Sequence, residues 1–394
     1  MDLTVSPSRL KGTVQAIPSK SQAHRFLICA AFADKPTTLH CPQTNEDIQA
    51  TAACLNALGA NIQRVHSGYE VVPILTVPRE ATLPCGESGS TLRFMLPIAG
   101  ALGIKATFLM KGRLPQRPLS PLWELMEEKG CTLTRPTADS ICCSDQLQPG
   151  NYTINGGVSS QFITGLLFAL SLLPGESHLE ITGKVESRPY IRMTQLALSS
   201  FGVQTDSGIL GNNFPLRSPG EITVEGDWSN AAFFLAAASM GQTIEVAGLS
   251  MHSPQGDRAA AELLSALRDF VTVDAADIPD LVPILSVVAG FKNGAIFTNI
   301  GRLRLKESDR VATVAAMLQQ LGANTVVTED TLTVYPGQYR SCTIDAAGDH
   351  RIAMAAAIAA TVADGPVTIL GAQCVSKSYP TFWTEFGKLG GLYE

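Results

Sequence analysis

The sequence predicts an α/β protein of two domains, built from six copies of one helix-and-strand unit. Three observations support this: the length of 394 residues, the 45% hydrophobic composition, and a segment pattern that returns in steps of about 70 residues, with one shorter step. A chain of this length exceeds the usual size of a single hydrophobic core, so two domains are expected.

The first recurring segment is a polar cluster followed by roughly ten apolar or small residues, as expected for about three helical turns. The copies begin at Ser19, Ser88, Ser159, Asp227, Pro279 and Gly348. Apolar character around the whole helix predicts burial on most faces. The alternative is chance similarity among Ala-rich helices, and six copies in the same order argue against it.

The second recurring segment is more amphipathic. Leu residues at helical spacing give way near a Gly to a β-branched run in "ACLNALGANIQRV", "LWELMEEKGCTLTR", "LALSSFGVQTD", "ELLSALRDFVTVD" and "MLQQLGANTVVT", and "EFGKLGGLYE" is a shortened sixth copy. This order predicts a helix, a C-cap and then a strand. Three copies per domain give a first domain over residues 13–221 and a second domain over residues 222–394. Residues 1–12 are expected to add a strand to the second domain.

Composition excludes several functions. The net charge of -6 and the lack of a basic run with interleaved aromatics exclude nucleic acid as a partner. The apolar stretches are too short to span a membrane and no secretory leader is evident, so we expect a soluble cytoplasmic protein. The nine cysteines include no CxxC pair, so we expect reduced thiols and no metal site.

Charged residues stand where the buried helices are expected to begin. Asp349, His350 and Arg351 precede the run "IAMAAAIAATVADG", and Lys20 and Arg25 open the first copy. Buried charges without partners are costly, whereas a helix N-terminus favours an anion. The sequence therefore predicts an anion-binding site at these helix starts. The alternatives are solvated surface charges and, for Asp349, a simple N-cap.

The stretch "RLRLKESDR" places Lys306, Glu307 and Arg310 at the expected start of another helix. Residues three or four apart share one helix face, so an ordinary salt-bridged first turn explains the pattern. In a catalytic interpretation, Glu307 and Asp280 are carboxyl groups held among cations, where they exchange protons with a substrate.

Ten stretches, spread over essentially the whole chain, resemble the 5-enolpyruvylshikimate-3-phosphate synthase family of enolpyruvyl transferases. They are "PSKSQAHR", "GESGSTLR", "LPQRPLSPL", "GGVSSQFITGLL", "ESRPYIRMT", "VEGDWSNAAFFLAAA", "IPDLVP", "LRLKESDR", "GDHRIAMA" and "CVSKSYP". The resemblance implies a two-domain inside-out α/β barrel, with three βαβαββ units per domain and the active site in the cleft between the domains.

The resemblance also implies a reaction. Members of the family transfer the enolpyruvyl group of phosphoenolpyruvate to the 5-hydroxyl of shikimate 3-phosphate and release phosphate, in the shikimate pathway to chorismate and aromatic amino acids. The two small-molecule substrates are the expected partners. No metal or organic cofactor is needed, most relatives act as monomers, and the herbicide glyphosate is expected to compete with phosphoenolpyruvate.

Residue by residue, the resemblance implies the ligands. For shikimate 3-phosphate they are Lys20, Ser21, Arg25, Ser159, Ser160, Gln161, Ser187, Tyr190, Asp280 and Lys306. For phosphoenolpyruvate they are Lys20, Gly89, Arg117, Gln161, Arg310, His350, Arg351 and Lys377. Asp280 is the expected base for the hydroxyl, and Glu307 with Lys20 the expected proton carriers. We expect His350 to orient its neighbours and contact substrate rather than act as a general acid.

Two other functions are alternatives to this one. The sister enolpyruvyl transferase that acts on UDP-N-acetylglucosamine uses a loop Cys before its counterpart of Arg117, and the stretch from Met110 to Arg117 contains none. A non-catalytic anion-binding protein would keep the cations but has little reason to keep both Asp280 and Glu307.

Overall fold

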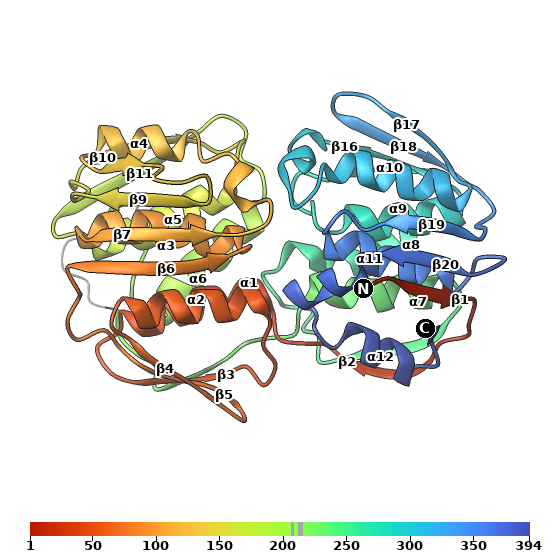
Figure 1. Cartoon of the computed structure of the whole chain (residues 1–394), viewed down its shortest axis with the longest axis horizontal. Helices are drawn as coiled ribbons and strands as arrows, with labels where there is room; N and C mark the ends of the chain where they lie inside the picture. Colours follow the sequence, from red (N-terminus) through yellow and green to blue (C-terminus); the bar gives the residue numbers. More distant parts are fainter. Residues whose placement is uncertain (206–208, 212–215) are drawn as a thin grey trace. The chain divides into compact units, whose positions relative to one another are not determined.

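The computed structural model describes residues 1–205, 209–211 and 216–394 and divides the chain into two compact units. The continuous unit is Lys20–Val224. The discontinuous unit combines Met1–Ser19 with Glu225–Glu394. Figure 1 shows the elements of both units in their sequence colours.

Six helices are buried along most of their length, which confirms the first recurring segment. In the continuous unit they are α1 (Lys20–Ala31), α3 (Gly89–Leu102) and α5 (Ser160–Leu172), and in the discontinuous unit α7 (Trp228–Ser239), α9 (Val282–Phe291) and α11 (His350–Ala360). All of the residues in α11 are buried, and this helix packs against both α7 and α9. Its many alanines permit the close approach of three helices.

Six further helices follow the second recurring segment. They are α2 (Glu46–Ala57), α4 (Leu122–Glu128), α6 (Arg188–Ser200), α8 (Ala260–Ala266), α10 (Arg310–Leu321) and α12 (Phe382–Lys388). The expected glycine ends α2 and α10, because Gly59 and Gly322 both have φ of 104°, where a side chain is disfavoured. The strand expected after α6 is wrong for Val203–Thr205, which forms no ladder with the described residues. The remainder of that stretch, Asp206, lies outside the described residues.

Three sheets belong to the continuous unit, in the strand orders β13-β3-β5-β4, β6-β7-β9-β8 and β10-β11-β12. Their strands are β3 (Thr37–His40), β4 (Asn61–Val65), β5 (Gly68–Val72), β6 (Glu80–Gly86), β7 (Lys105–Met110), β8 (Thr132–Thr134), β9 (Ser140–Ser144), β10 (Asn151–Asn155), β11 (Glu176–Thr182), β12 (Ile209–Gly211) and β13 (Glu221–Thr223).

Three more sheets belong to the discontinuous unit, in the orders β14-β2, β15-β16-β18-β17 and β19-β20-β1-β21. Their strands are β1 (Leu3–Ser6), β2 (Lys11–Gln15), β14 (Thr243–Ala247), β15 (Val271–Asp274), β16 (Ala295–Thr298), β17 (Asn324–Val327), β18 (Thr331–Tyr335), β19 (Cys342–Asp345), β20 (Val367–Leu370) and β21 (Leu392–Tyr393). Among the residues that the structure describes there are also four short 3₁₀ turns: η1 (Leu114–Gln116), η2 (Gly256–Ala259), η3 (Gly301–Leu305) and η4 (Ala372–Lys377).

Each sheet contains one parallel strand pair. In four sheets a buried helix connects the two strands, as α3 connects β6 to β7, which is the usual crossover of a parallel pair. The other two pairs exchange partners: β2 precedes α1 but pairs with β14, and β13 precedes α7 but pairs with β3. The chain therefore passes twice between the units, near Ser19 and near Val224.

Helices α3 and α5 pack side by side (Figure 1). Pro97 lies within α3 and has no N–H, so the carbonyl of Arg93 one turn earlier lacks its helical donor. That oxygen lies against Gly165 of α5, where an added Cβ would be only 2.3 Å away. A glycine is thus required for this helix contact, which sets the position of Arg93.

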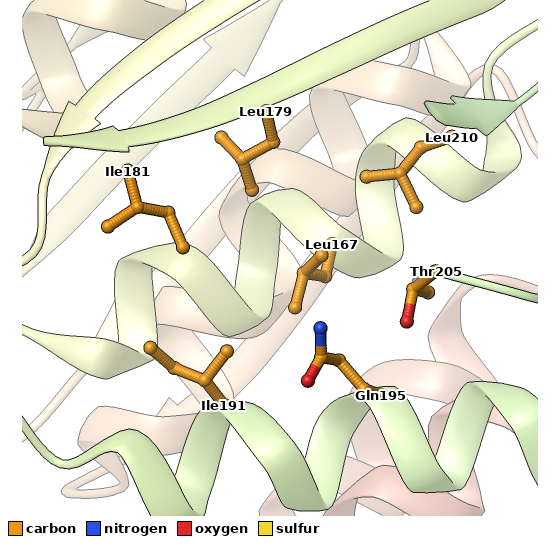
Figure 2. A pocket seen from close by; sticks show the side chains of 7 residues that line it. All are labelled: Leu167, Leu179, Ile181, Ile191, Gln195, Thr205 and Leu210. Atoms are coloured by element: carbon orange, nitrogen blue, oxygen red, sulfur yellow. The ribbon is translucent and has the colours of Figure 1, made fainter. Parts of the chain in front are cut away.

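A cavity of about 240 Å³ lies within the continuous unit, bounded by α5, α6, β11 and β12 (Figure 2). Its lining is Leu167, Leu179, Ile181, Ile191, Gln195, Thr205 and Leu210. No lining residue is charged, so this cavity does not suit an anionic ligand. Among the described residues, no helix is both long and apolar enough to cross a bilayer.

Candidate active site

The expected ligands fall into two groups, one in each compact unit. The continuous unit holds Lys20, Ser21, Arg25, Gly89, Arg117, Ser159, Ser160, Gln161, Ser187 and Tyr190. The discontinuous unit holds Asp280, Lys306, Glu307, Arg310, His350, Arg351 and Lys377. Most of these residues stand at or beside a helix start, where unpaired N–H groups favour anions.

Arg25 is buried on α1 and fixed by several acceptors. Its Nε donates to Thr194 Oγ1 at 2.9 Å, and its Nη2 donates to the Tyr190 carbonyl at 2.9 Å and to Thr164 Oγ1 at 3.3 Å. Its Nη1 donates to the Ser21 carbonyl at 2.6 Å. Burial lowers the pKa of Arg25 to about 10, so the group stays charged at neutral pH. Three expected ligands are therefore brought together in one cluster: Ser21, Arg25 and Tyr190.

Arg93 forms a second cluster with Gln161. Its Nη1 donates to Gln161 Oε1 at 3.1 Å, and the amide nitrogen of Gln161 donates to Ser90 Oγ at 2.9 Å. A Cβ on Gly89 would lie 2.6 Å from Arg93 Nη1 and 2.5 Å from Arg117 Nη1. Gly89 is therefore the point where two guanidinium groups approach the backbone of one helix start.

Lys20 opens α1 and pairs with Asp47 near the start of α2, with 2.9 Å between Nζ and Oδ2. Both side chains are largely but incompletely buried, at 14% and 15% exposure. An exposed ion pair would contribute little to stability, whereas this partly buried pair holds the Lys20 ammonium group in one place.

The expected phosphate-binding serines sit at two further helix starts. Ser159 caps α5, its Oγ accepting from Gln161 N at 3.3 Å. Ser187 precedes α6 with φ of 53°, a left-handed conformation that a serine adopts only under constraint. Ser187 is nearly fully buried, so its surroundings hold the strained backbone in place.

Arg310 is the centre of the cluster in the discontinuous unit, with a side chain only 1% exposed. Its Nη1 lies 2.8 Å from Asp280 Oδ1, its Nη2 2.7 Å from Glu307 Oε2, and its Nε 3.0 Å from Asp349 Oδ2. Burial opposes the charge, but these three carboxylates outweigh burial and raise the pKa of Arg310 above its usual value.

Arg351 shares Asp280 with Arg310. Its Nη2 lies 2.9 Å from Asp280 Oδ2, and its Nη1 donates to Ser229 Oγ at 2.7 Å and to the Asp280 carbonyl at 3.3 Å. Two buried guanidinium groups thus meet at one carboxylate. Burial alone would raise the pKa of Asp280, but Arg351, Lys306 and Arg310 together hold it well below its usual range.

Asp349 explains why charged residues open the buried helix α11. It is fully buried, and its carboxylate caps Arg351 N at 3.0 Å, accepts from Arg310 Nε and accepts from Ser308 Oγ at 3.1 Å. The N-cap alternative is confirmed, and the same carboxylate also forms a buried ion pair. Each charge therefore has a partner, as burial requires.

The expected first turn at Lys306 is wrong, because α10 begins only at Arg310. Lys306 is extended, with φ of -85° and ψ of -159°, and Asp309 caps the helix by accepting from Ala312 N at 3.1 Å. The contact between Glu307 and Arg310 still forms, from a loop rather than along a helix face.

Lys306 and Asp257 have unusual proton affinities. Burial, with help from Arg302 and Arg310 and against Asp280, lowers the pKa of Lys306 to about 7. Burial, together with Asp280, raises the pKa of Asp257 to about 7. Such values favour proton exchange near neutral pH.

Ser160 is the buried first residue of α5, and two more expected ligands lie in the discontinuous unit. His350 is buried in the first turn of α11, and Lys377 ends η4 with its Nζ donating to the Gly348 carbonyl at 3.0 Å. Sequence reasoning missed the partners Asp47, Ser90, Ser229 and Ser308. Its list of ligands also omitted Arg93, although that cation at the start of a recurring segment was a usable signal.

The chain matches the family model described as EPSP synthase (3-phosphoshikimate 1-carboxyvinyltransferase) over residues 5–276 and 265–386. It is 35% identical to the 3-phosphoshikimate 1-carboxyvinyltransferase of Clostridium kluyveri, covering 99% of this chain and 97% of the relative. It is 36% identical to that of Clostridium acetobutylicum, covering 98% and 97%.

Two solved structures share the fold. An EPSP synthase from Acinetobacter baumannii gives a TM-score of 0.80 at 22% identity, covering 100% of this chain and 99% of that chain. The enolpyruvyl transferase NikO from Streptomyces tendae gives 0.79 at 17% identity, covering 100% and 98%. On the full-length match and the relatives above 30% identity, this chain belongs to the EPSP synthase family.

Proposed function

We propose that this chain transfers the enolpyruvyl group of phosphoenolpyruvate to the 5-hydroxyl of shikimate 3-phosphate and releases phosphate. It is a 3-phosphoshikimate 1-carboxyvinyltransferase of the shikimate pathway, as its family and its relatives' names indicate. The transfer needs neither a metal nor an organic cofactor.

The charge of the two substrates makes the clustered cations necessary. Together they carry about five or six negative charges near pH 7, since each phosphate has a second pKa near 6. Fixed guanidinium groups and helix N-termini offset the repulsion of such a pair.

The observation that carries the proposal is the meeting of Arg310 and Arg351 at Asp280. Both guanidinium groups are buried and held in place by ion pairs with protein carboxylates. Preorganised cations of this kind stabilise charge that develops during a reaction without further reorganisation. An incoming carboxylate or phosphate would replace Asp280 as a partner of Arg351.

The binding roles follow the resemblance. Shikimate 3-phosphate takes Lys20, Ser21, Arg25, Ser159, Ser160, Gln161, Ser187, Tyr190, Asp280 and Lys306, and phosphoenolpyruvate takes Lys20, Gly89, Arg117, Gln161, Arg310, His350, Arg351 and Lys377. The Arg25 cluster supports the first set, and the approach of Arg117 to Gly89 supports the second. Neither compact unit contains a whole set, so both units are needed for activity.

The reaction proceeds by addition and elimination. The 5-hydroxyl oxygen bonds to C2 of phosphoenolpyruvate and loses its proton while C3 gains one, which gives a tetrahedral intermediate. This intermediate then loses phosphate from C2 and a proton from C3. Asp280 is the assigned base for the hydroxyl, with Glu307 and Lys20 assigned to the C3 proton.

The pKa values qualify the role of Asp280. A carboxylate whose pKa lies well below its usual range is a weak base, so Asp280 gains basicity only when a substrate anion occupies Arg351. Lys306, with a pKa near 7, is better matched to proton transfer before that point. We therefore add Lys306 to the groups that exchange protons with the shikimate hydroxyls.

A phosphate-release assay tests the proposed function. The chain should release phosphate only when phosphoenolpyruvate and shikimate 3-phosphate are both present. Release with UDP-N-acetylglucosamine as the acceptor instead would favour the sister transferase, and no release with either acceptor would favour a non-catalytic anion-binding protein.

Four further expectations complete the proposal. The βαβαββ units form an inside-out α/β barrel, one lobe covers residues 13–221, and the other combines residues 1–12 with 222–394. The protein acts as a monomer and is located in the cytoplasm. Sedimentation equilibrium of the active protein tests the monomer, because a dimer would give twice the molecular mass of one chain.

A further inference from the structure

Three buried side chains of the continuous unit form a hydrogen-bonded chain that the proposed reaction does not use. His24 Nδ1 lies 2.7 Å from Thr51 Oγ1, and Thr51 Oγ1 lies 2.7 Å from Thr91 Oγ1. The side chains come from α1, α2 and α3, and all three residues are fully buried. We call this chain the His24–Thr51–Thr91 ladder.

The ladder has a defined direction of donation. Thr91 Oγ1 donates to Ser88 Oγ at 2.8 Å, so its oxygen accepts from Thr51, and Thr51 accepts in turn from His24 Nδ1–H. This assigns His24 as the neutral Nδ1–H tautomer. Burial, together with Lys20 and Arg25, lowers the pKa of His24 well below its usual value and keeps it neutral.

Each member of the ladder lies one helical turn below a residue of a helix start. His24 follows Lys20 by four residues, Thr51 follows Asp47 by four, and Thr91 follows the N-cap Ser88 by three. Such spacings place two side chains on the same helix face. The ladder therefore joins the three helix starts directly beneath their first turns.

The first turns above the ladder in α1 and α3 carry two residues assigned to phosphoenolpyruvate, Lys20 and Gly89. Ser88 accepts from Thr91 N at 3.2 Å and immediately precedes Gly89. Thr91 Oγ1 also lies 3.4 Å from the carbonyl of Asp47, whose carboxylate pairs with Lys20. Lys20 and Gly89 are thus both tied to one set of buried hydrogen bonds.

Most of the ligands assigned to shikimate 3-phosphate lie outside the ladder, although Lys20 is assigned to both substrates. Arg25 is the neighbour of His24 on α1, yet it bonds to Thr164 on α5 and to Thr194 and the Tyr190 carbonyl on α6. A change in the ladder should therefore affect phosphoenolpyruvate, whose ligands Lys20 and Gly89 both lie above it, more than shikimate 3-phosphate, which shares only the α1 start with it.

We propose that His24, Thr51 and Thr91 are positioning residues that set the spacing of the α1, α2 and α3 starts and so place Lys20 and Gly89 for phosphoenolpyruvate. The inference rests on the proposed function only for the identity of that substrate. A satisfied polar chain contributes little net stability compared with apolar side chains of equal shape, but it specifies one register of packing. An apolar contact would hold the helices together without fixing their spacing.

The test uses the near-isosteric variants Thr51→Val and Thr91→Val, with Ser171→Ala as the matched control. Ser171 is also a buried hydroxyl in a helix, but it donates only to Leu167 O, at 2.7 Å, in α5. Each Val variant leaves a buried polar partner unsatisfied, so it should melt up to about 5 °C below the wild type, while the KM for phosphoenolpyruvate rises about 5- to 20-fold. The KM for shikimate 3-phosphate, which shares Lys20, should rise less, by at most about threefold, and kcat should change less than about twofold.

Two further variants sharpen the result. If the hydroxyls act through one chain, the double variant should raise the KM for phosphoenolpyruvate no more than either single variant. His24→Asn, whose amide can donate in place of Nδ1–H, should keep a KM near wild type, whereas His24→Leu should behave like the Val variants. Equal rises in both KM values, or additive effects, would overturn the proposal.

Hydrogen exchange separates this inference from the proposed function. In Thr51→Val, peptides that cover residues 86–96 should exchange faster than in the wild type, and those that cover 160–172 should not. This readout needs no substrate. Unchanged exchange at 86–96 would refute the ladder even in an active enzyme, whereas faster exchange in a chain without transferase activity would refute only the substrate assignment.

Discussion

Replacing Asp349 separates its two roles in the discontinuous unit. Asp349→Asn keeps an oxygen that can cap Arg351 N, now 3.0 Å away, but removes the negative charge beside Arg310 Nε. Asp349→Ala removes both. The difference in the free energy of unfolding between the two variants therefore measures the contribution of the cap. The loss in the Asn variant measures the contribution of the ion pair.

The magnitude follows from what Arg310 retains. Breaking a fully buried ion pair costs about 3–5 kcal/mol when the remaining charge has no other partner. Arg310 keeps Asp280 at 2.8 Å and Glu307 at 2.7 Å, so the cost should fall below that range. We expect a loss of about 2 kcal/mol in the free energy of unfolding for Asn, and about 1 kcal/mol more for Ala because the cap is lost.

Urea unfolding followed by tryptophan fluorescence provides the assay. Trp228 and Trp383 lie in the discontinuous unit, so a Trp123→Phe background removes the tryptophan of the continuous unit. Asp309→Asn is the matched control, since Asp309 also caps a helix but is 43% exposed and lies 3.8 Å from Arg304. Its loss should stay under about 1 kcal/mol. An Asp349→Asn variant within about 0.5 kcal/mol of the wild type would refute the reasoning.

Three other outcomes are expected. When shikimate 3-phosphate binds near pH 8, the protein should take up about one proton or less, because an anion beside Lys306 raises the pKa of Lys306 from about 7. Calorimetry in two buffers should show this proton uptake, and Lys306→Met should abolish it. Asp257 binds its proton more tightly in the folded protein than in the unfolded one, so the free energy of unfolding of the wild type should fall as the pH rises from about 4 to 7. An equally steep fall in the Asp257→Asn variant would contradict this. Gly89→Ala places a Cβ 2.5 Å from Arg117 Nη1, so the KM for phosphoenolpyruvate should rise about tenfold and glyphosate inhibition should weaken in steady-state assays, with unchanged inhibition as the contrary result.

The helices could be predicted from sequence because their signals are local. The polar start and the apolar run of α11 lie within one short segment of sequence. The same holds for α10, the glycine that ends it and the strand β17 that follows. The exchange of β2 and β13 could not be predicted, since each pairs with a strand that no neighbouring residue specifies. The start of α10 was misplaced because Asp309, rather than an earlier residue, caps it.

The site shows the same division. Residue types at helix starts, such as Lys20 and Arg351, indicated anion binding, and the resemblance supplied their roles. The partners could not be predicted, because Asp349 bonds to Arg310 across 39 residues and His24 bonds to Thr51 across 27. Contacts of this kind depend on the packing of helices that are distant in sequence.

The position of β1 between β20 and β21 has a consequence for biosynthesis. Val5 pairs with Val367 and with Tyr393, so the first strand has no partner until nearly all of the chain has left the ribosome. At about 5–20 residues per second, that wait lasts roughly 20 to 70 seconds. Residues 20–224 can fold during this time, so β1 is made before them and yet is among the last strands to be paired.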